Sequence, residues 1–100
     1  MPTMDSNDAT PMNVLVLNSG SASLRFQLIE SDGRESDRCL ALGLVERIGG
    51  HAVTTTRIGD GPKEVRNAPI RDHRAAVDSI IRWVISNEAE IASVRSVIRP

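Results

Sequence analysis

The feature that most constrains the fold is a pair of strand-like segments joined by small polar residues, in the stretch VLVLNSGSASLRFQL. Residues 14–17 are consecutively apolar, which is typical of a strand covered on both faces. Leu24, Phe26 and Leu28 then alternate with polar residues, which indicates a strand with one buried face. Because the connection is short and contains a glycine, we expect the two segments to form a β-hairpin, with strands over 13–17 and 24–30.

Three more segments of strand character follow, separated by the turn-forming sequences SDGRESD, IGGH and GDGP. They are RCLALGLVER over 38–47, the β-branched AVTTTRI over 52–58, and the weaker KEVRNAP over 63–69. Asp60, within GDGP, is explained by turn chemistry. These segments predict sequential, mostly antiparallel strands.

After Pro69 the apolar residues change to a helical period. They lie at positions i, i+3 and i+4 and form one face of an amphipathic helix, comprising Ala76, Val77, Ile80, Ile81, Val84 and Ile85. Asp72 is a suitable N-cap, and the helix is expected to end near Asn87. The tail over 90–100 predicts a further helical turn and then the start of another strand. The fold class is therefore α/β, with antiparallel strands followed by one amphipathic helix.

Composition indicates one small domain in a reducing compartment. The chain has 100 residues, 40% of them hydrophobic, and a net charge of -1, so no basic surface for nucleic acid is expected. No stretch approaches the roughly 20 apolar residues of a membrane-spanning helix. The polar start over 1–11 is unlike a signal peptide and predicts a disordered leader. With Cys39 as its single cysteine, the protein is expected in the cytoplasm.

The loop over 18–25 lacks the features of the two familiar nucleotide motifs. A Walker loop needs Gly-Lys-Ser/Thr and a dinucleotide fingerprint needs three glycines, and both precede a helix, whereas a strand follows here. Small polar residues at a solvated turn are the alternative explanation for such a loop taken alone. The donors nevertheless suit an oxyanion: Gly20 permits close approach of the backbone, and the hydroxyls of Ser19, Ser21 and Ser23 can donate.

Two further side chains extend this set of groups. Asn18 offers a neutral carbonyl oxygen that suits hydrated Mg²⁺. Arg25 offers a positive charge and a planar donor pair for phosphate.

The spacing NxGSxSx[K/R] between VLVL and FQLIE resembles the N-terminal phosphate hairpin of the acetate kinase family. GLVERIG over 43–49 is similar to the third-strand motif of that family, and Asp72-His73 followed by xxAV is similar to the opening of its first helix. The resemblance covers residues 13–98. It implies a ribonuclease H-like half-domain from the superfamily of acetate and sugar kinases, heat-shock chaperones and actin, whose members bind ATP between two domains.

The resemblance also implies roles for individual residues. Asn18 corresponds to the family's Mg²⁺-associated asparagine, and Ser21 and Ser23 to its phosphate-loop serines. Ser19 and Gly20, between these positions, are expected to contact the ATP phosphates as well. Arg25 stands where most members have an ATP-contacting lysine, which keeps the charge and changes the donor geometry. In this loop Ala22 replaces the family's middle serine.

Residues 12–100 are expected to form an incomplete N-terminal domain. The family's substrate-binding arginines, catalytic aspartate, transition-state histidine and adenosine-binding domain have no counterpart here, so no catalytic residue is assigned. The implied reaction is ATP plus acetate to ADP plus acetyl phosphate, with propionate or butyrate as alternative substrates. The isolated chain is expected to be inactive, with a complementing second fragment as a possible partner and no support for a dimer. The alternative function is a non-catalytic remnant or a partial nucleotide or phosphate binder.

Three other side chains have simpler interpretations. His73, in the first helical turn beside Asp72, is interpreted as a capping or packing residue rather than an acid–base group. His51 is expected to be a solvated loop residue. Cys39 is expected to be a small buried hydrophobe, because no base lies near it in the sequence.

Overall fold

The structure is a computed structural model that describes residues 12–31 and 37–98. The predicted leader over 1–11, the Asp32-Gly33 turn and Pro100 lie outside the described residues.

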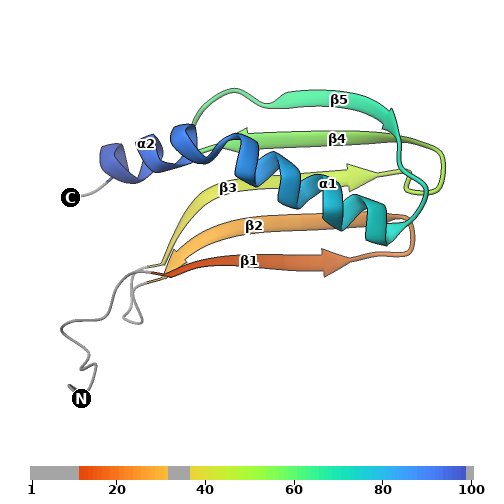
Figure 1. Ribbon diagram of the computed structural model, residues 1–100, viewed down its shortest axis with the longest axis horizontal. Helices are drawn as coiled ribbons and strands as arrows, with labels where there is room; N and C mark the ends of the chain where they lie inside the picture. The colour runs from red at the N-terminus through yellow and green to blue at the C-terminus, as the bar shows by residue number, and fades with distance from the viewer. Residues whose placement is uncertain (1–11, 32–36, 99–100) are drawn as a thin grey trace, which may run out of the picture.

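The described residues form a five-stranded antiparallel meander, with its strands in the order β1-β2-β3-β4-β5 (Figure 1). The strands are β1 (Met12–Ser19), β2 (Ser23–Ser31), β3 (Asp37–Glu46), β4 (His51–Ile58) and β5 (Glu64–Pro69). The prediction of sequential antiparallel strands is confirmed. Each connection is short, as expected for neighbouring antiparallel strands.

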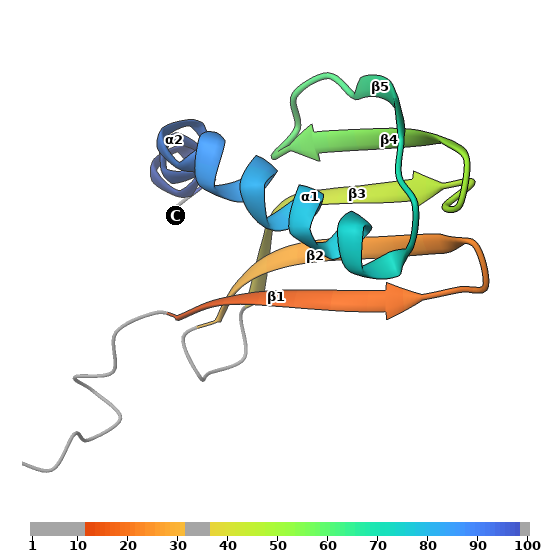
Figure 2. The same ribbon diagram turned by 45° about the vertical axis from the view of Figure 1, so that its right-hand side comes forward.

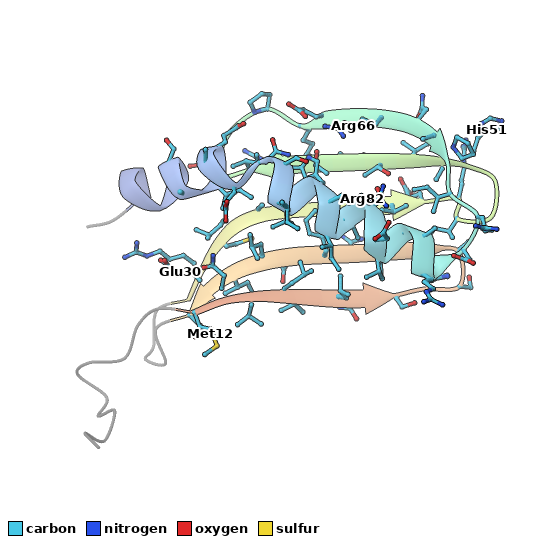
Figure 3. The ribbon with its side chains drawn as sticks, in the orientation of Figure 1. Met12, Glu30, His51, Arg66 and Arg82 are labelled. Carbon is cyan, nitrogen blue, oxygen red and sulfur yellow. The ribbon has the colours of Figure 1, made fainter. Side chains whose placement is uncertain are left out.

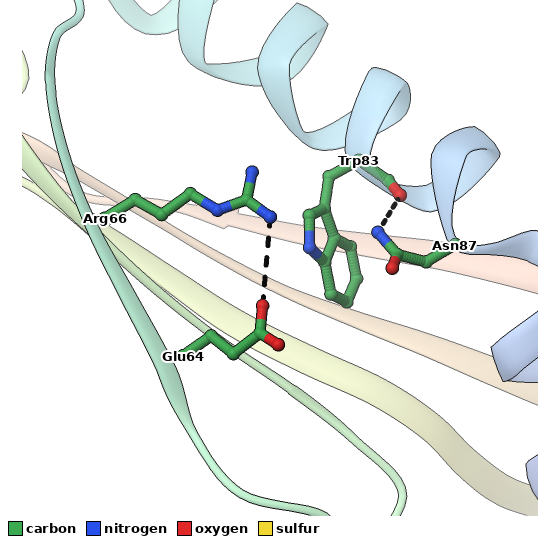
Figure 4. Close-up of polar contacts among 4 residues, drawn as sticks. All are labelled: Glu64, Arg66, Trp83 and Asn87. Atoms are coloured by element: carbon green, nitrogen blue, oxygen red, sulfur yellow. Dashed lines mark hydrogen bonds and ion pairs between the residues drawn. The ribbon is translucent and has the colours of Figure 1, made fainter.

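Two helices follow the sheet, α1 (His73–Ser86) and α2 (Glu88–Ile98). In both ribbon views α1 starts beside the β1–β2 connection and crosses one face of the sheet diagonally (Figures 1 and 2). The predicted N-cap is confirmed, because Asp72 Oδ1 accepts a hydrogen bond from Ala75 N–H at 2.9 Å. At the other end Asn87 Nδ2 donates to the Trp83 carbonyl at 2.8 Å (Figure 4).

The strand expected at the end of the tail does not start within the described residues, because α2 continues to Ile98. Glu88 and Glu90 occupy its first turn, where acidic side chains stabilise the positive end of the helix dipole. Ile91 is buried in the core, which anchors the helix to the sheet. Among the described residues no helix has the length and apolarity needed to cross a membrane.

The core is centred on Phe26, which is 1% exposed. Its ring meets the edge of Trp83 from α1, with 5.6 Å between ring centroids and an interplanar angle of 63°. Gly43 pairs with Phe26 across β2 and β3, and a Cβ at Gly43 would lie 2.2 Å from the Phe26 ring. The absence of a side chain at Gly43 therefore lets the ring lie flat against the neighbouring strand.

A β-bulge in the β2–β3 pairing corrects the prediction for Cys39. Leu28 pairs with Ala41 and Ile29 pairs with Cys39, so Leu40 is the extra residue. Leu40 and Ala41 are both buried as a result, and Cys39 is exposed. A regular alternation would have turned Cys39 inward together with Ala41, and the bulge reverses this.

The prediction that β1 is covered on both faces is wrong for the described residues. β1 is an edge strand, and all but one of its residues are exposed. In the views of Figures 1 and 2 the described helices lie on one face of the sheet. The strand register places several exposed apolar side chains on the opposite face, namely Met12, Val14, Val16, Leu42 and Val65.

We expect Gly43→Ala to lower the free energy of unfolding by about 1–3 kcal/mol, because the new methyl group overlaps the Phe26 ring and the Thr55 carbonyl. Gly50→Ala is the matched control, since a Cβ at Gly50 meets nothing within 4 Å. Urea unfolding of both variants measures the difference. Equal midpoints for the two variants would contradict this account of the core.

Candidate functional site at the tip of the β1–β2 hairpin

Residues 20–22 connect β1 to β2 and lie at an exposed end of the sheet. Gly20 N–H donates to the Ser23 carbonyl at 2.9 Å, which closes the turn. The site residues predicted from the sequence therefore occupy the last two positions of β1, the connection itself and the start of β2.

The register brings some of these side chains together and separates one. Asn18 pairs directly with Arg25, so the carboxamide and the guanidinium start from adjacent positions on the sheet face away from α1. Ser23 shares that face by alternation along β2. Ser21 is exposed at the tip, whereas Ser19 pairs with the buried Leu24 and so belongs to the α1 face.

Arg25 supplies a positive charge to the far face of the sheet. It is exposed, and no carboxylate pairs with it among the described residues. Glu46 pairs with Ser23 and lies on the same face, outside ion-pair distance of Arg25. The guanidinium is therefore available to bind an external anion.

The backbone of the tip has free hydrogen-bond donors, whereas most of its carbonyl acceptors are occupied. The carbonyl of Ala22 accepts from Ile48 N–H at 2.9 Å, and the carbonyls of Gly20 and Ser23 also accept hydrogen bonds within the protein. For the N–H groups of Ser21 and Ala22, no acceptor is found within the described part of the chain. Three carbonyls around the tip are thus satisfied, whereas that of Ser21 has no donor among the described residues. The two free N–H groups are suited to hold an anion.

His73 is the residue at this site that the sequence interpretation missed. Its Nε2 lies 2.8 Å from the Gly20 carbonyl oxygen and 3.1 Å from that of Ser23. Carbonyl oxygens only accept, so Nε2 carries the proton and donates to both. Asp72 and not His73 caps the helix, so His73 takes the first position of α1.

Gly20 provides space rather than an unusual backbone conformation. Its φ lies outside the left-handed region. A Cβ at Gly20 would lie 2.5 Å from Ser23 Oγ, so the glycine leaves room for that hydroxyl.

A cavity beside the core lies away from the hairpin tip. A cavity of about 430 Å³ lies between α1 and strands β4 and β5, with Phe26, Ile80 and Trp83 among its lining residues. Arg66 also lines it and forms an ion pair of 3.8 Å with Glu64 (Figure 4). None of the hairpin-tip residues lines this cavity, so the tip is an open surface site.

The Cys39 thiol is exposed and has a raised pKa. Desolvation raises its pKa above the ordinary value, and its thiol donates to the Ala41 carbonyl at 3.4 Å. The thiolate, which is the nucleophile, is therefore scarce at neutral pH.

We expect Cys39 to react with iodoacetamide more slowly in the folded chain than in the urea-unfolded chain at pH 7.5, because the raised pKa in the folded state lowers the thiolate fraction. The two rates should converge as the pH rises through the folded-state pKa. Mass spectrometry of the alkylated product gives both rates. Faster alkylation of the folded chain would contradict the assigned direction.

We expect Gly20→Ala to change unfolding stability by less than about 1 kcal/mol, because the Ser23 hydroxyl can rotate away from the new methyl group. The displaced hydroxyl should weaken binding of inorganic tripolyphosphate. Titration calorimetry and thermal unfolding separate the two effects. A large loss of stability with unchanged affinity would show that Gly20 serves folding alone.

Comparison of the sequence with known proteins identifies a matching family and similar relatives. The model of the acetokinase family matches residues 13–98. Similar relatives include the acetate kinases of Solibacter usitatus, 47% identical over 89 residues, Chloroherpeton thalassium, 37% over 94, and Clostridium botulinum, 39% over 90. The matches cover 85%, 85% and 83% of this chain and 22% of each relative, so the chain spans about a fifth of their length.

Proposed function

Because this chain belongs to the acetokinase family, we propose that its β1–β2 hairpin binds the terminal phosphates of ATP in a carboxylate phosphotransferase of the acetate kinase type. The observation that carries the proposal is the polarity of the tip: its carbonyls at Gly20, Ala22 and Ser23 are occupied within the protein, and the N–H groups of Ser21 and Ala22 remain available. Oxyanions bind to such backbone donors.

The side chains complement these backbone donors. Arg25 supplies charge and a bidentate donor pair, and the hydroxyls of Ser21 and Ser23 supply further donors. Ser19 contributes through its position next to the tip, although its side chain belongs to the α1 face. An ATP phosphate approaching from the uncovered face would meet Arg25 and Ser23 first.

Asn18 is the proposed Mg²⁺ ligand, and its chemistry fits that role in part. A neutral carboxamide oxygen suits a hard cation. The described residues include no group of three or more histidine, cysteine, aspartate or glutamate side chains arranged to hold a metal. Mg²⁺ would therefore be bound through Asn18 together with the nucleotide phosphates, whose charge it neutralises.

The proposed reaction transfers the γ-phosphoryl group of ATP to a carboxylate oxygen of acetate, giving ADP and acetyl phosphate. Transfer of this kind depends on positioning and charge neutralisation. In this account the hairpin holds and orients the phosphates, and no residue of this chain is assigned to bond making or breaking. We therefore propose that the isolated chain binds the nucleotide without turnover. Propionate or butyrate are alternative acceptors.

We propose that a second protein segment covers the sheet face away from α1. That face carries exposed apolar side chains, including Val14, Val16 and Leu42, and burial of such surface stabilises a complex. A complementing second fragment is the proposed protein partner, with ATP, ADP and a short-chain carboxylate as small-molecule partners and the cytoplasm, where ATP is supplied, as the compartment. A phosphate-binding remnant without a catalytic partner is the alternative, and it predicts the same hairpin chemistry.

We expect Arg25→Gln to weaken binding of Mg-ATP by about ten- to a hundredfold, the effect of losing a charge-assisted hydrogen bond to phosphate. Arg25→Lys should retain an intermediate affinity, because the charge remains and the planar donor pair is lost. Isothermal titration of the 100-residue chain measures all three affinities.

Arg66→Gln is the control for this titration, because Arg66 is an exposed arginine of β5 whose strand position lies on the α1 face. It should bind Mg-ATP as the unchanged chain does. Equal losses for Arg25→Gln and Arg66→Gln would show only a general charge effect. Absence of binding by the unchanged chain at millimolar nucleotide would contradict the proposed function.

A further inference from the structure

We propose that His73 is a positioning residue that fixes the polarity of the phosphate-binding tip, by drawing two of its carbonyl groups toward α1. The inference rests on the proposed function for what the tip binds. The claim that His73 holds the two carbonyls rests only on the contacts of His73.

The contacts link two parts of the chain that are far apart in sequence. His73 Nε2 lies within hydrogen-bond distance of the Gly20 and Ser23 carbonyl oxygens, at 2.8 and 3.1 Å. These two carbonyls bracket the connection. Of the two carbonyls between them, that of Ala22 accepts from Ile48 N–H, and that of Ser21 has no donor among the described residues. The imidazole and the β3–β4 turn therefore hold the tip from two sides.

The consequence for an anion is electrostatic. A carbonyl oxygen carries a partial negative charge and repels phosphate, whereas an N–H group attracts it. With the carbonyls of Gly20 and Ser23 held by His73, the tip presents the N–H groups of Ser21 and Ala22 without competition from these oxygens. Without the imidazole donor, the Gly20 carbonyl would keep only the 3.4 Å hydrogen bond from Ser19 Oγ, and the Ser23 carbonyl only the bond from Gly20 N–H. Both carbonyls would then be less firmly held away from a bound phosphate.

The position of His73 depends on how α1 is seated. The Asp72 cap starts the helix immediately before His73, and Trp83 packs against Phe26 in β2, the strand that follows the hairpin connection. α1 begins beside the β1–β2 connection in both ribbon views (Figures 1 and 2). The packing of Trp83 against Phe26 therefore also places the His73 imidazole beside the tip.

The test compares two substitutions of different chemistry with a control. His73→Gln keeps an N–H donor at a similar reach, and His73→Phe keeps the ring volume without a donor. His51→Phe is the control, because His51 is exposed at the start of β4 and projects beside β5 (Figure 3).

The first readout is independent of any ligand. Hydrogen exchange by NMR reports the Gly20 amide, which donates to Ser23, and the Ile48 amide, which donates to Ala22. His73→Phe should accelerate exchange of both amides and shift the resonances of Ser21 and Ala22, while amides of the central strands β2 and β3 exchange as before. His73→Gln should restore the protection, and His51→Phe should leave it unchanged.

The second readout is the affinity for inorganic tripolyphosphate with Mg²⁺. His73→Phe should weaken it by about tenfold, and His73→Gln should lie within about threefold of the unchanged chain. If His73→Phe leaves tip exchange and affinity equal to those of His51→Phe, the positioning role is overturned. If the tip loosens in His73→Phe and the unchanged chain binds no tripolyphosphate, the positioning role holds and the proposed function fails.

Discussion

The packing of Phe26 against Gly43 on one side and Trp83 on the other is the interaction on which the rest of the structure depends. It seats α1 across β2 and β3, and this fixes where the helix starts. Because α1 starts at His73, the imidazole reaches the hairpin tip. A chain with two aromatic residues thus uses both of them at the contact that relates the helix to the candidate site.

The candidate site owes its chemistry to the backbone as much as to side chains. Hydrogen bonds within the protein occupy the carbonyls of Gly20, Ala22 and Ser23, and the N–H groups of Ser21 and Ala22 remain as donors. Asn18 and Arg25 face each other across the hairpin, so a metal-compatible oxygen and a phosphate-compatible cation share one face. That face is also the one that the described helices leave uncovered (Figures 1 and 2).

Much of the fold could be predicted from sequence because local patterns agreed with the final packing. The five strands, their antiparallel order and the helix from Asp72 to Asn87 follow from alternation, turn residues and a capping side chain. Cys39 was misplaced because a bulge at Leu40 reverses the alternation, and a bulge has no signal in side-chain pattern alone. The edge position of β1 was missed because its run of apolar residues is typical of a strand buried on both faces. Within the described residues these side chains are mostly exposed. The hydrogen bonds from His73 to the Gly20 and Ser23 carbonyls were missed because they join residues about fifty positions apart, and local sequence patterns do not report such contacts.

The most direct test of the central claim is a pair of NMR titrations of the ¹⁵N-labelled chain, one with Mg-ATP and one with adenosine. The account predicts that Mg-ATP shifts the amides of Ser21 and Ala22 and the side-chain signals of Asn18 and Arg25, whereas adenosine leaves them in place. Shifts confined to the Trp83 indole and the cavity between α1 and β5, or no shifts with Mg-ATP at all, would contradict the claim that the hairpin tip binds phosphate.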